Sequence, residues 1–358
     1  MLVADAESSH GEEAQCLIMA MCAVVLIQVE EPHQRLFEAE GIQHANRELG
    51  KILLGEAMAA HHDLSSKFNP CLERALSTFF LYACHASLFH HSQAFYFLRE
   101  AGTLWLVLRI DQVDTLRRKL AGRLFWVIMV SERSHGIRYR RPITLQVASS
   151  APGFDGEQDT GLSGLRALVA LFRPLDTAFF ALLNQEETVF GSALASVLDA
   201  IQSAISGALG PKESKTLCET QIANLRVTQL WLLIILWQLR LRLGMLVEQS
   251  GVPSHMTFHY PVEVGRELVG AMQAMSLESV RLHGAGITEK IFDIACAMAD
   301  VLSRVPLIDS SGTGLVNILY LRQLIHQLPG GPSTYDPLLD KHIRNTLPDL
   351  PGRPRPAA

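Results

Sequence analysis

Residues 116–145 read LRRKLAGRLFWVIMVSERSHGIRYRRPITL, and the fold of the surrounding chain is best predicted from this stretch. Apolar residues recur in it at steps of three and four, which is the period of one buried face of an α-helix. The residues of this face are Leu116, Leu120, Leu124, Val127 and Ile128. Phe125, Trp126 and Met129 widen the face, so we expect a helix that is surrounded on most sides.

Polar and helix-breaking residues mark the two ends of this predicted helix. A basic cluster enters it, formed by Arg117, Arg118, Lys119 and Arg123. Gly136 and Pro142 mark its exit, because glycine is tolerated at a helix end and proline cannot continue a helix. An ordinary interpretation stays open, since any buried helix of a large α-protein can carry Leu-Phe-Trp at core positions and a basic cluster is commonly a solvated turn.

The order of several short motifs in and before this helix is more informative than any one of them. Inside the stretch they are Arg123-Leu124-Phe125-Trp126, Glu132-Arg133 and Arg140-Arg141-Pro142-Ile143-Thr144-Leu145. Upstream they are residues 77–83, STFFLYA, and residues 95–101, FYFLREA. This order resembles the middle homology region of fungal zinc-binuclear-cluster (Zn2Cys6) transcription factors, specifically their sugar-regulator-like branch. The resemblance covers roughly residues 69–145, and the remainder agrees with the family only in being helical.

The resemblance implies a helical regulatory domain and not an enzyme. Such a domain would act in the nucleus, on metabolic or secondary-metabolite biosynthetic genes. It would sense a small-molecule inducer or mask an activation surface, and it would transmit this state to other transcription regulators, with a homodimer as an open alternative. DNA would be contacted only indirectly or through a separate N-terminal module. The residues of the implied structural motif are Arg123, Leu124, Phe125, Trp126, Glu132, Arg133, Arg141 and Pro142.

The cysteines do not have the spacing of a zinc binuclear cluster. Six are present, at Cys16, Cys22, Cys71, Cys84, Cys218 and Cys296, and none forms a Cys-x-x-Cys pair. A compact thiolate site needs closely spaced ligands, so we expect no cofactor in this chain, the zinc belonging to the family's N-terminal cluster. Scattered cysteines indicate reduced thiols and an intracellular protein. Either the gene model omits a cluster, or the protein is a coregulator that acts through protein contacts alone.

Composition favours a large helical core. Of 358 residues, 48% are hydrophobic and 19% are charged, so many helices should be covered on several sides. The net charge of −5 leaves no overall electrostatic footprint for nucleic acid. Residues 16–29 form an apolar run that is too short to span a bilayer as a straight helix, and residues 230–237 form a shorter one. We expect both to be buried helices, and we expect no membrane partner.

Helical periodicity and turn residues predict an all-α fold, a large irregular bundle of antiparallel helix hairpins. Two antiparallel helices are expected between Cys71 and Leu108, with a corner at His90-His91-Ser92, and Ile143–Val147 is the only modest strand candidate. The predicted organisation is a disordered start over residues 1–13, a first helical half over 14–148, a loop over 149–163, a more variable helical half over 164–346 and a Pro-rich disordered tail over 347–358.

No motif in the sequence points firmly to catalysis or to metal binding. The fourteen histidines include the adjacent pairs His61-His62 and His90-His91, but neighbours on a helix point about 100° apart and chelate poorly. Neither His-Glu-x-x-His nor Gly-x-Ser-x-Gly occurs in the sequence. We therefore expect no enzyme activity and no metal site. The alternative interpretation is a helical enzyme or a membrane-associated protein of a biosynthetic pathway.

Two hypotheses concern individual side chains. Arg123 lies beside Leu-Phe-Trp, so we expect its guanidinium to be partly buried and paired with Glu132 or Glu100, because an unpaired buried charge costs about 3–5 kcal/mol. Arg123 and Glu132-Arg133 would then hold the packing of the helices in register. A small ligand could also lie between helices, lined by aromatic residues, with plain core packing as the competing interpretation. The aromatic residues in question are Phe80, Phe97, Trp105 and Trp126.

Overall fold

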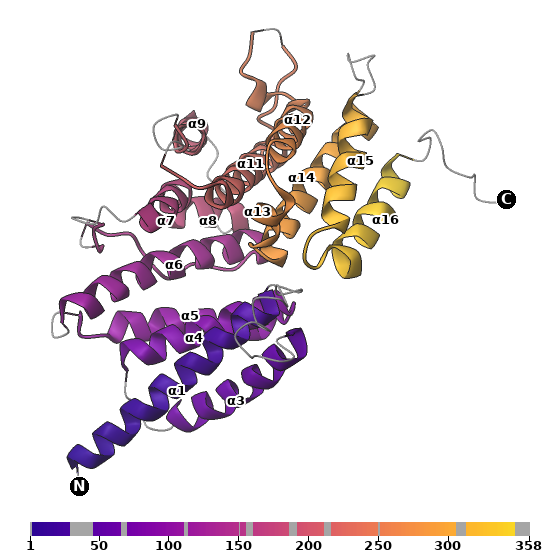
Figure 1. The fold of residues 1–358 in the computed structure, drawn as a ribbon. Helices are drawn as coiled ribbons and strands as arrows, with labels where there is room; N and C mark the ends of the chain where they lie inside the picture. The colour runs from indigo at the N-terminus through magenta and orange to yellow at the C-terminus, as the bar shows by residue number, and fades with distance from the viewer. Residues whose placement is uncertain are drawn as a thin grey trace. The chain divides into compact units, whose positions relative to one another are not determined.

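The computed structural model confirms the all-α prediction (Figure 1). It describes residues 2–28, 46–65, 70–110, 114–149, 151–154, 160–185, 192–210, 216–249, 251–305 and 313–347. Within these ranges the chain forms fourteen α-helices and no β-strand. Ile143–Val147, the strand candidate, has no regular secondary structure.

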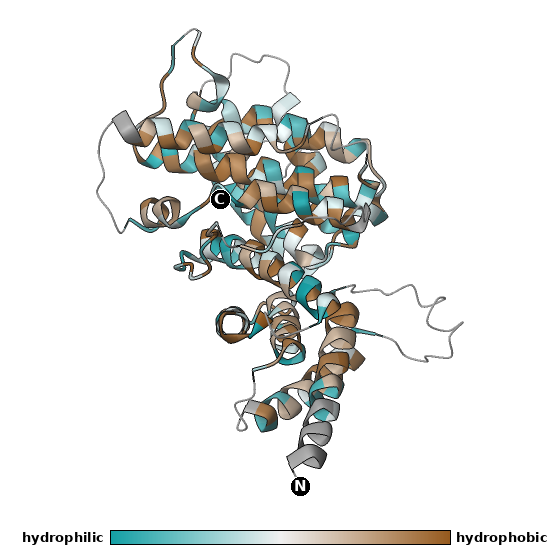
Figure 2. Ribbon diagram, turned by 90° about the vertical axis from the view of Figure 1, so that its left-hand side faces the viewer, coloured by the Kyte–Doolittle hydropathy of each residue, from teal (hydrophilic) through white to brown (hydrophobic). Residues whose placement is uncertain are grey.

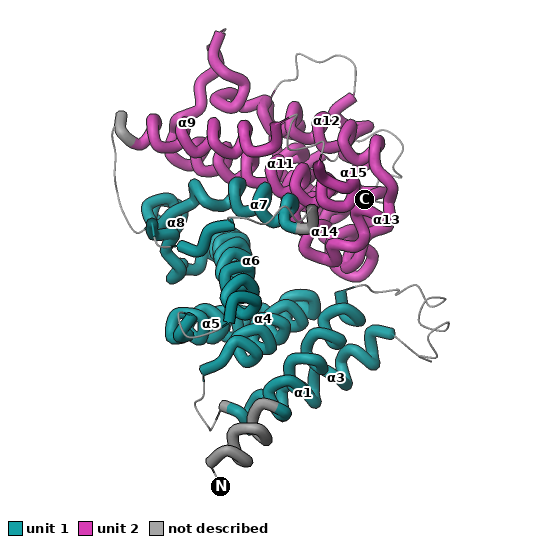
Figure 3. Tube along the Cα trace, turned by 60° about the vertical axis from the view of Figure 1, so that its left-hand side comes forward, with its two compact units in different colours: residues 1–190 teal, residues 191–358 magenta. Residues whose placement is uncertain are grey.

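Two compact units divide the chain, Met1–Phe190 and Gly191–Ala358 (Figure 3). Unit 1 contains α1 (Leu2–Gln28), α3 (Arg47–Ser65), α4 (Leu72–Ser87), α5 (His91–Val107), α6 (Thr115–Tyr139), α7 (Thr160–Phe172) and α8 (Thr177–Asn184). Unit 2 contains α9 (Ser192–Gly207), α11 (Glu219–Arg242), η2 (Ser254–Met256), α12 (Tyr260–Gln273), α13 (Leu277–Arg281), α14 (Ala285–Arg304), α15 (Thr313–His326), η3 (Gly331–Tyr335) and α16 (Asp336–Thr346). This boundary differs from the predicted one. The loop predicted at 149–163 lies inside unit 1, because α7 and α8 pack against α6.

The N-terminal helix also differs from its prediction. α1 begins at Leu2, whereas residues 1–13 were predicted to be disordered from their polar and acidic character. The segment is also rich in alanine and glutamate, which are good helix formers. It can therefore extend α1 towards the N-terminus, beyond the part of the helix that packs against other helices. Of the predicted tail over 347–358, only Leu347 lies within the described residues.

In unit 1, α1, α3, α4 and α5 share a core that consists mostly of small and branched side chains. This core includes Ala20, Ala23, Val24, Ile27, Leu54, Ala57, Leu81, Cys84 and Phe97. α3 and α1 approach closely at Gly50, where an added Cβ would meet the Cγ1 atom of Ile27 at 2.9 Å. α4 and α5 form the predicted antiparallel hairpin. Its corner lies at Phe89, whose φ of 61° is in the left-handed region.

In unit 2, α11 is the central helix. α9, α12, α13 and α14 all pack against it. Its two indole groups are satisfied inside the unit, because Trp231 donates to the Oδ2 atom of Asp293 at 2.8 Å and Trp237 donates to the carbonyl of Thr257 at 2.9 Å. The prediction that residues 230–237 belong to a buried helix is therefore confirmed.

Among the residues that the structure describes, two helices are long and apolar enough to cross a bilayer, judged by length and composition. They are Gly11–Gln28 of α1 and Glu219–Arg242 of α11, and the bent pair α7 and α8 would add a third if it formed one broken span. Of these two helices, 72% of the α11 window but only 39% of the α1 window is buried. Figure 2 shows hydrophobic brown along the upper half of the helix that runs up from the N label. The exposed apolar residues there are Ile18, Met21 and Val25.

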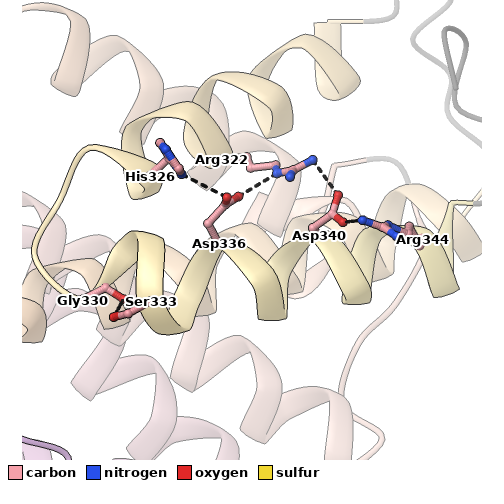
Figure 4. A network of polar contacts seen from close by, with 7 residues as sticks. All are labelled: Arg322, His326, Gly330, Ser333, Asp336, Asp340 and Arg344. Carbon is pink, nitrogen blue, oxygen red and sulfur yellow. Dashed lines mark hydrogen bonds and ion pairs between the residues drawn. The ribbon is translucent and has the colours of Figure 1, made fainter.

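A network of ion pairs joins α15 to α16 in unit 2 (Figure 4). The guanidinium of Arg322 lies 2.7 Å from Asp336 and 2.6 Å from the buried carboxylate of Asp340. His326 contacts Asp336 at 3.1 Å, and Arg344 pairs with Asp340. The connection between the helices contains a single π-helical turn, η3. Gly330, the residue before this turn, has a positive φ of 72°.

The substitution Gly331→Ala tests this connection. A Cβ atom at this position would overlap the backbone carbonyl oxygen of Ile325, and backbone cannot move aside as a flexible side chain can. We expect a loss of about 2–4 kcal/mol in the free energy of unfolding, measured in urea on the full chain. Gly270→Ala is the matched control, because an added Cβ there meets nothing within 4 Å. It should be neutral or stabilising by up to about 1 kcal/mol, and equal effects of the two substitutions would contradict the expectation.

Candidate functional site

The candidate site is the C-terminal half of α6 and the segment 141–148 that follows it. From Ala121 onwards α6 is largely buried, and Leu124, Phe125 and Trp126 are at most 4% exposed. The predicted buried face is confirmed for Leu124 and Ile128. It is wrong for Leu116 and Leu120, which are 67% and 36% exposed, because the first turns of α6 extend beyond the helices that cover the rest.

Glu132 binds the chain that leaves α6. Its Oε1 atom accepts hydrogen bonds from the backbone N–H of Thr144 at 2.8 Å and from the Thr144 hydroxyl, while its Oε2 atom accepts from the N–H of Leu145 at 2.9 Å. Arg99 of α5 completes the set, with Nη1 2.8 Å from Oε1. The Glu132 side chain is only 4% exposed, so these bonds replace the water that a carboxylate would otherwise need.

The predicted partner of this carboxylate was wrong. Glu132 pairs with Arg99, and Glu100 contacts His61 at 3.1 Å, so neither carboxylate pairs with Arg123. Arg123 is half-buried, as expected. It lies nine residues before Glu132 on the same helix, a separation of about 13–14 Å at 1.5 Å per residue, which a side chain cannot bridge. Arg99, from a neighbouring helix, was the residue that sequence reasoning missed.

Arg133 of α6 and Arg140, the C-cap residue of this helix, bind backbone carbonyls around α8. Arg133 is 1% exposed, and its Nε atom donates to the carbonyl of Leu175 at 2.7 Å. Burial lowers the pKa of Arg133 to about 10, against the opposing effects of Glu132 and Asp176, so the group stays charged at neutral pH. Arg140 caps α6 in the left-handed region with a φ of 52°, and its Nη1 atom donates to the carbonyl of Leu183 at 2.6 Å. These contacts fix α8 against α6.

Gly136 permits the exit of the chain from α6. Arg141 donates its backbone N–H to the Gly136 carbonyl at 3.1 Å. A Cβ at Gly136 would lie 2.7 Å from the Cε1 atom of Phe180 and 3.0 Å from the Arg141 carbonyl. The predicted helix end is therefore confirmed, although the helix continues to Tyr139 before it stops.

Arg141 and Pro142, the last residues of the predicted motif, are exposed. The Arg141 guanidinium lies over the Phe95 ring at 5.2 Å. Pro142 borders an open pocket of about 380 Å³ in unit 1. The residues that line this pocket are Pro142, Ile143, Thr177, Ala178, Phe180, Ala181 and Asn184.

The four aromatic residues predicted to line one ligand site fall into two separate packing clusters. Trp105 and Trp126 both contact Phe125, with ring centroids at 4.6 Å and 4.9 Å, and Trp126 donates to the carbonyl of Pro152. Phe97 instead stacks on His85 at 5.3 Å. Phe97 also belongs to the core that α1, α3, α4 and α5 share, and Phe80 packs against that core. None of the four lines the pocket at Pro142, so core packing describes them better.

His135 occupies an aromatic cage between α4, α5 and α6. Its ring stacks on Phe95 at 5.5 Å and contacts Tyr82 at 6.3 Å and Tyr139 at 4.5 Å. Burial lowers the pKa of His135 to about 4, assisted by the nearby His91 and Arg141. The imidazole is therefore neutral at physiological pH and acts as a packing group.

Comparison with known proteins gives one distant similarity. The sequence is 22% identical over 306 residues to the probable sucrose utilization protein SUC1 of Candida albicans. The alignment covers 81% of this chain but 58% of the relative, so the chain spans little more than half the length of the curated protein it matches. A share of 81% is larger than either compact unit, so the similarity reaches into both. No family model and no solved structure matches the chain.

The charged groups of the candidate site make structural contacts. The oxygens of Glu132 and the Nε atom of Arg133 are engaged by fixed partners, which is the opposite of a group poised to transfer protons. In the described part of the chain, no group of three or more His, Cys, Asp or Glu side chains could hold a metal ion.

The Glu132→Gln substitution tests the contacts of Glu132 with Arg99, Thr144 and Leu145 at the end of α6. The amide removes the charge that pairs with Arg99, and its NH2 group cannot accept the Leu145 N–H. We expect a loss of about 3 kcal/mol in the free energy of unfolding, measured in urea. Glu48→Gln on α3 is the control, because Glu48 pairs with Lys51 at the surface and should change stability by no more than about 0.5 kcal/mol. A similarly small effect at Glu132 would show that these contacts do not stabilise the fold.

The neutral, buried imidazole of His135 predicts that the stability of the protein depends on pH. The folded-state pKa of about 4 lies below the ordinary value of 6.5, so the unfolded chain binds more protons between these values. Stability should therefore fall as the pH drops from about 6.5 towards 4. His135→Phe should remove about 1–3 kcal/mol of this loss, measured as the midpoint of urea unfolding at several pH values. A pH profile of His135→Phe identical to that of the wild type would exclude this origin.

Proposed function

We propose that this chain is the helical regulatory module of a fungal transcription regulator. It would control sugar-utilisation, other metabolic or secondary-metabolite biosynthetic genes. The observation that carries the proposal is the ordered motif of α6. Glu132, Arg133 and Arg140, whose order resembles the middle homology region, each bind groups distant in sequence.

The distant relative supports the same direction. Its printed name refers to sucrose utilization, and the motifs of residues 77–145 resemble the sugar-regulator-like branch of the family. The two arguments are partly independent, because the similarity to this relative extends well beyond the motifs, into both units.

Contact with DNA is proposed to be indirect. The six cysteines lack the spacing of a zinc binuclear cluster and the net charge is −5, so the chain itself offers little to a phosphate backbone. A DNA-bound partner regulator, or a zinc-cluster segment of a longer protein, would supply that contact in the nucleus. A homodimer is one form such a partnership could take.

We assign the proposed small-molecule inducer to the pocket beside Pro142. The pocket combines the apolar side chains of Ile143 and Phe180 with the polar groups of Thr177 and Asn184. Pockets of a few hundred Å³ with a few polar groups suit small ligands. Its wall includes Pro142 and Ile143, which directly precede the two residues whose backbone N–H groups Glu132 binds, so occupancy would act on these hydrogen bonds.

A membrane-associated protein is the second candidate function. It is favoured by one observation, the apolar window Gly11–Gln28 of α1, of which only 39% is buried. The corresponding window of α11 is 72% buried, which favours a helix of the protein core at that position.

A tethering experiment tests the regulatory function. The chain is fused to a heterologous DNA-binding domain in yeast, and a reporter gene downstream of the matching operator is measured on sucrose, maltose, glucose and glycerol. We expect reporter output to differ by at least about threefold from that of the DNA-binding domain alone on at least one carbon source, because a regulatory module acts wherever it is tethered. Output equal to the control on every carbon source, at equal protein level, would contradict the proposal. A fusion retained in membranes would favour the second candidate.

A further inference from the structure

An arginine stands three residues before a hydroxyl-bearing residue at two places in the sequence. Arg74 precedes Ser77, and Arg141 precedes Thr144. Many serine/threonine protein kinases select this spacing, because carboxylates of the kinase bind a guanidinium on the amino side of the residue that accepts the phosphate. The fold separates the two places, since Ser77 is 1% exposed inside α4, whereas Arg141 and Thr144 are both exposed.

Thr144 lies in a segment that can open without the unwinding of a helix. Segment 141–148 has no regular secondary structure. Its buried side chains, Ile143 and Leu145, alternate with exposed ones, which indicates an extended backbone of the kind that kinases bind in their substrates. Opening must withdraw these two side chains from the core, and a local opening of this size costs less than global unfolding.

Arg141 can exchange its present contact for a kinase carboxylate. Its guanidinium lies over the Phe95 ring at 5.2 Å, and the residue is exposed. A cation–π contact at the surface is weaker than a charge-assisted hydrogen bond to a carboxylate.

The Thr144 hydroxyl belongs to the group of bonds around Glu132. It donates to the Oε1 atom of Glu132 and accepts from the Nη1 atom of Arg99. The same Oε1 atom accepts the Thr144 N–H at 2.8 Å, and the Oε2 atom accepts the Leu145 N–H at 2.9 Å. A chemical change at this hydroxyl therefore acts at the point where Glu132 holds the segment against α6.

We propose that Thr144 is a phosphorylation site and that its modification releases segment 141–148 from α6. The phosphoryl donor is ATP. A bond forms between the Thr144 hydroxyl oxygen and the γ-phosphorus, and the bond from that phosphorus to the β,γ-bridging oxygen breaks. ADP leaves, and the hydroxyl proton passes to the catalytic base of the kinase. This site does not rest on the function proposed above.

The release follows from the charge of the product. Phosphothreonine carries about −1.5 to −2 charges at pH 7. It would lie beside the Glu132 carboxylate, which is only 4% exposed, and the single guanidinium of Arg99 cannot neutralise both groups. Like charges at this distance repel strongly where water is excluded, so the open segment becomes the favoured state. Pro142 and Ile143 would move with it and change the wall of the pocket beside α8.

The first test is phosphorylation of the full chain. The protein is incubated with ATP and a calcium/calmodulin-dependent protein kinase, which selects arginine at this spacing, and the modified residues are mapped by tandem mass spectrometry. We expect phosphate at Thr144 and none at Ser77. Synthetic peptides of residues 70–82 and 137–149 should both be modified, because the spacing is the same in both and only the fold buries Ser77.

Protein variants test recognition and opening separately. Arg141→Gln should slow the modification of Thr144 at least about tenfold, whereas Arg109→Gln, another exposed arginine, should leave the rate unchanged. Glu132→Gln should raise the rate at least about threefold, because weaker bonds to the segment increase its open fraction. Thr144→Ser should keep the reaction and Thr144→Val should abolish it, since only serine retains the hydroxyl.

Hydrogen exchange measures the release of the segment. The N–H groups of Thr144 and Leu145 are bound to Glu132, so they should exchange slowly in the unmodified protein. Phosphorylation should speed their exchange at least about tenfold, while the amides of α11 in unit 2 exchange as before. Thr144→Glu should exchange faster at Leu145 than Thr144→Gln, which has the same size and no charge.

Three results would overturn the proposal. The first is a full chain that carries no phosphate at Thr144 although the 137–149 peptide is modified. The second is an unchanged rate in Arg141→Gln, or modification of Ser77 to the same extent as Thr144, which would mean that the kinase acts on unfolded chains. The third is a phosphorylated protein whose Thr144 and Leu145 amides exchange at the rate of the unmodified protein.

Discussion

A single buried carboxylate determines how unit 1 is assembled around α6. Glu132 binds Arg99 of α5 on one side and the backbone N–H groups of Thr144 and Leu145 on the other. The segment after α6 has no regular secondary structure, so its backbone groups need partners from elsewhere. Because the carboxylate supplies them, the chain turns back along α6 and brings Pro142 and Ile143 to the pocket near α8.

Charged groups inside both units serve the same purpose, which is to satisfy groups that the helices cannot pair for themselves. Arg133 and Arg140 bind carbonyls near α8 in unit 1. In unit 2, the buried guanidinium of Arg240 binds Gln202 and Asp199, each at 2.9 Å. A buried charge is tolerated only with such partners, and a charge engaged in this way is held in one geometry. Buried ionisable groups with perturbed pKa values therefore indicate packing more than catalysis in this protein.

The helix α6 contributes to the interior along most of its length and to the surface at its first turns. Its apolar period is the same in both parts, from Leu116 to Ile128. Burial differs because α5 ends at Val107 and covers α6 only from about Ala121 onwards. Periodicity therefore identified the apolar face of the helix correctly. It did not show which part of that face another helix covers. The same limit explains why Phe80, Phe97, Trp105 and Trp126 are predicted as one lining but lie in two clusters, Phe80 with Phe97 and the two tryptophans around Phe125.

The sequence by itself determined the helical class, the α4–α5 hairpin, the burial of residues 230–237 and the exit of α6 near Gly136, because each depends on periodicity or on a conformational preference within a few residues. Only the tertiary structure decided the partners of the charged residues. Arg99 precedes Glu132 by 33 positions and Arg133 reaches a carbonyl 42 positions away, and no local pattern encodes such pairs. Arg123 and Glu132 share a helix, and its rise of about 1.5 Å per residue separates them, although they are neighbours in the motif. Contacts between helices depend on how whole faces pack, which is a property of the folded chain and not of any single stretch.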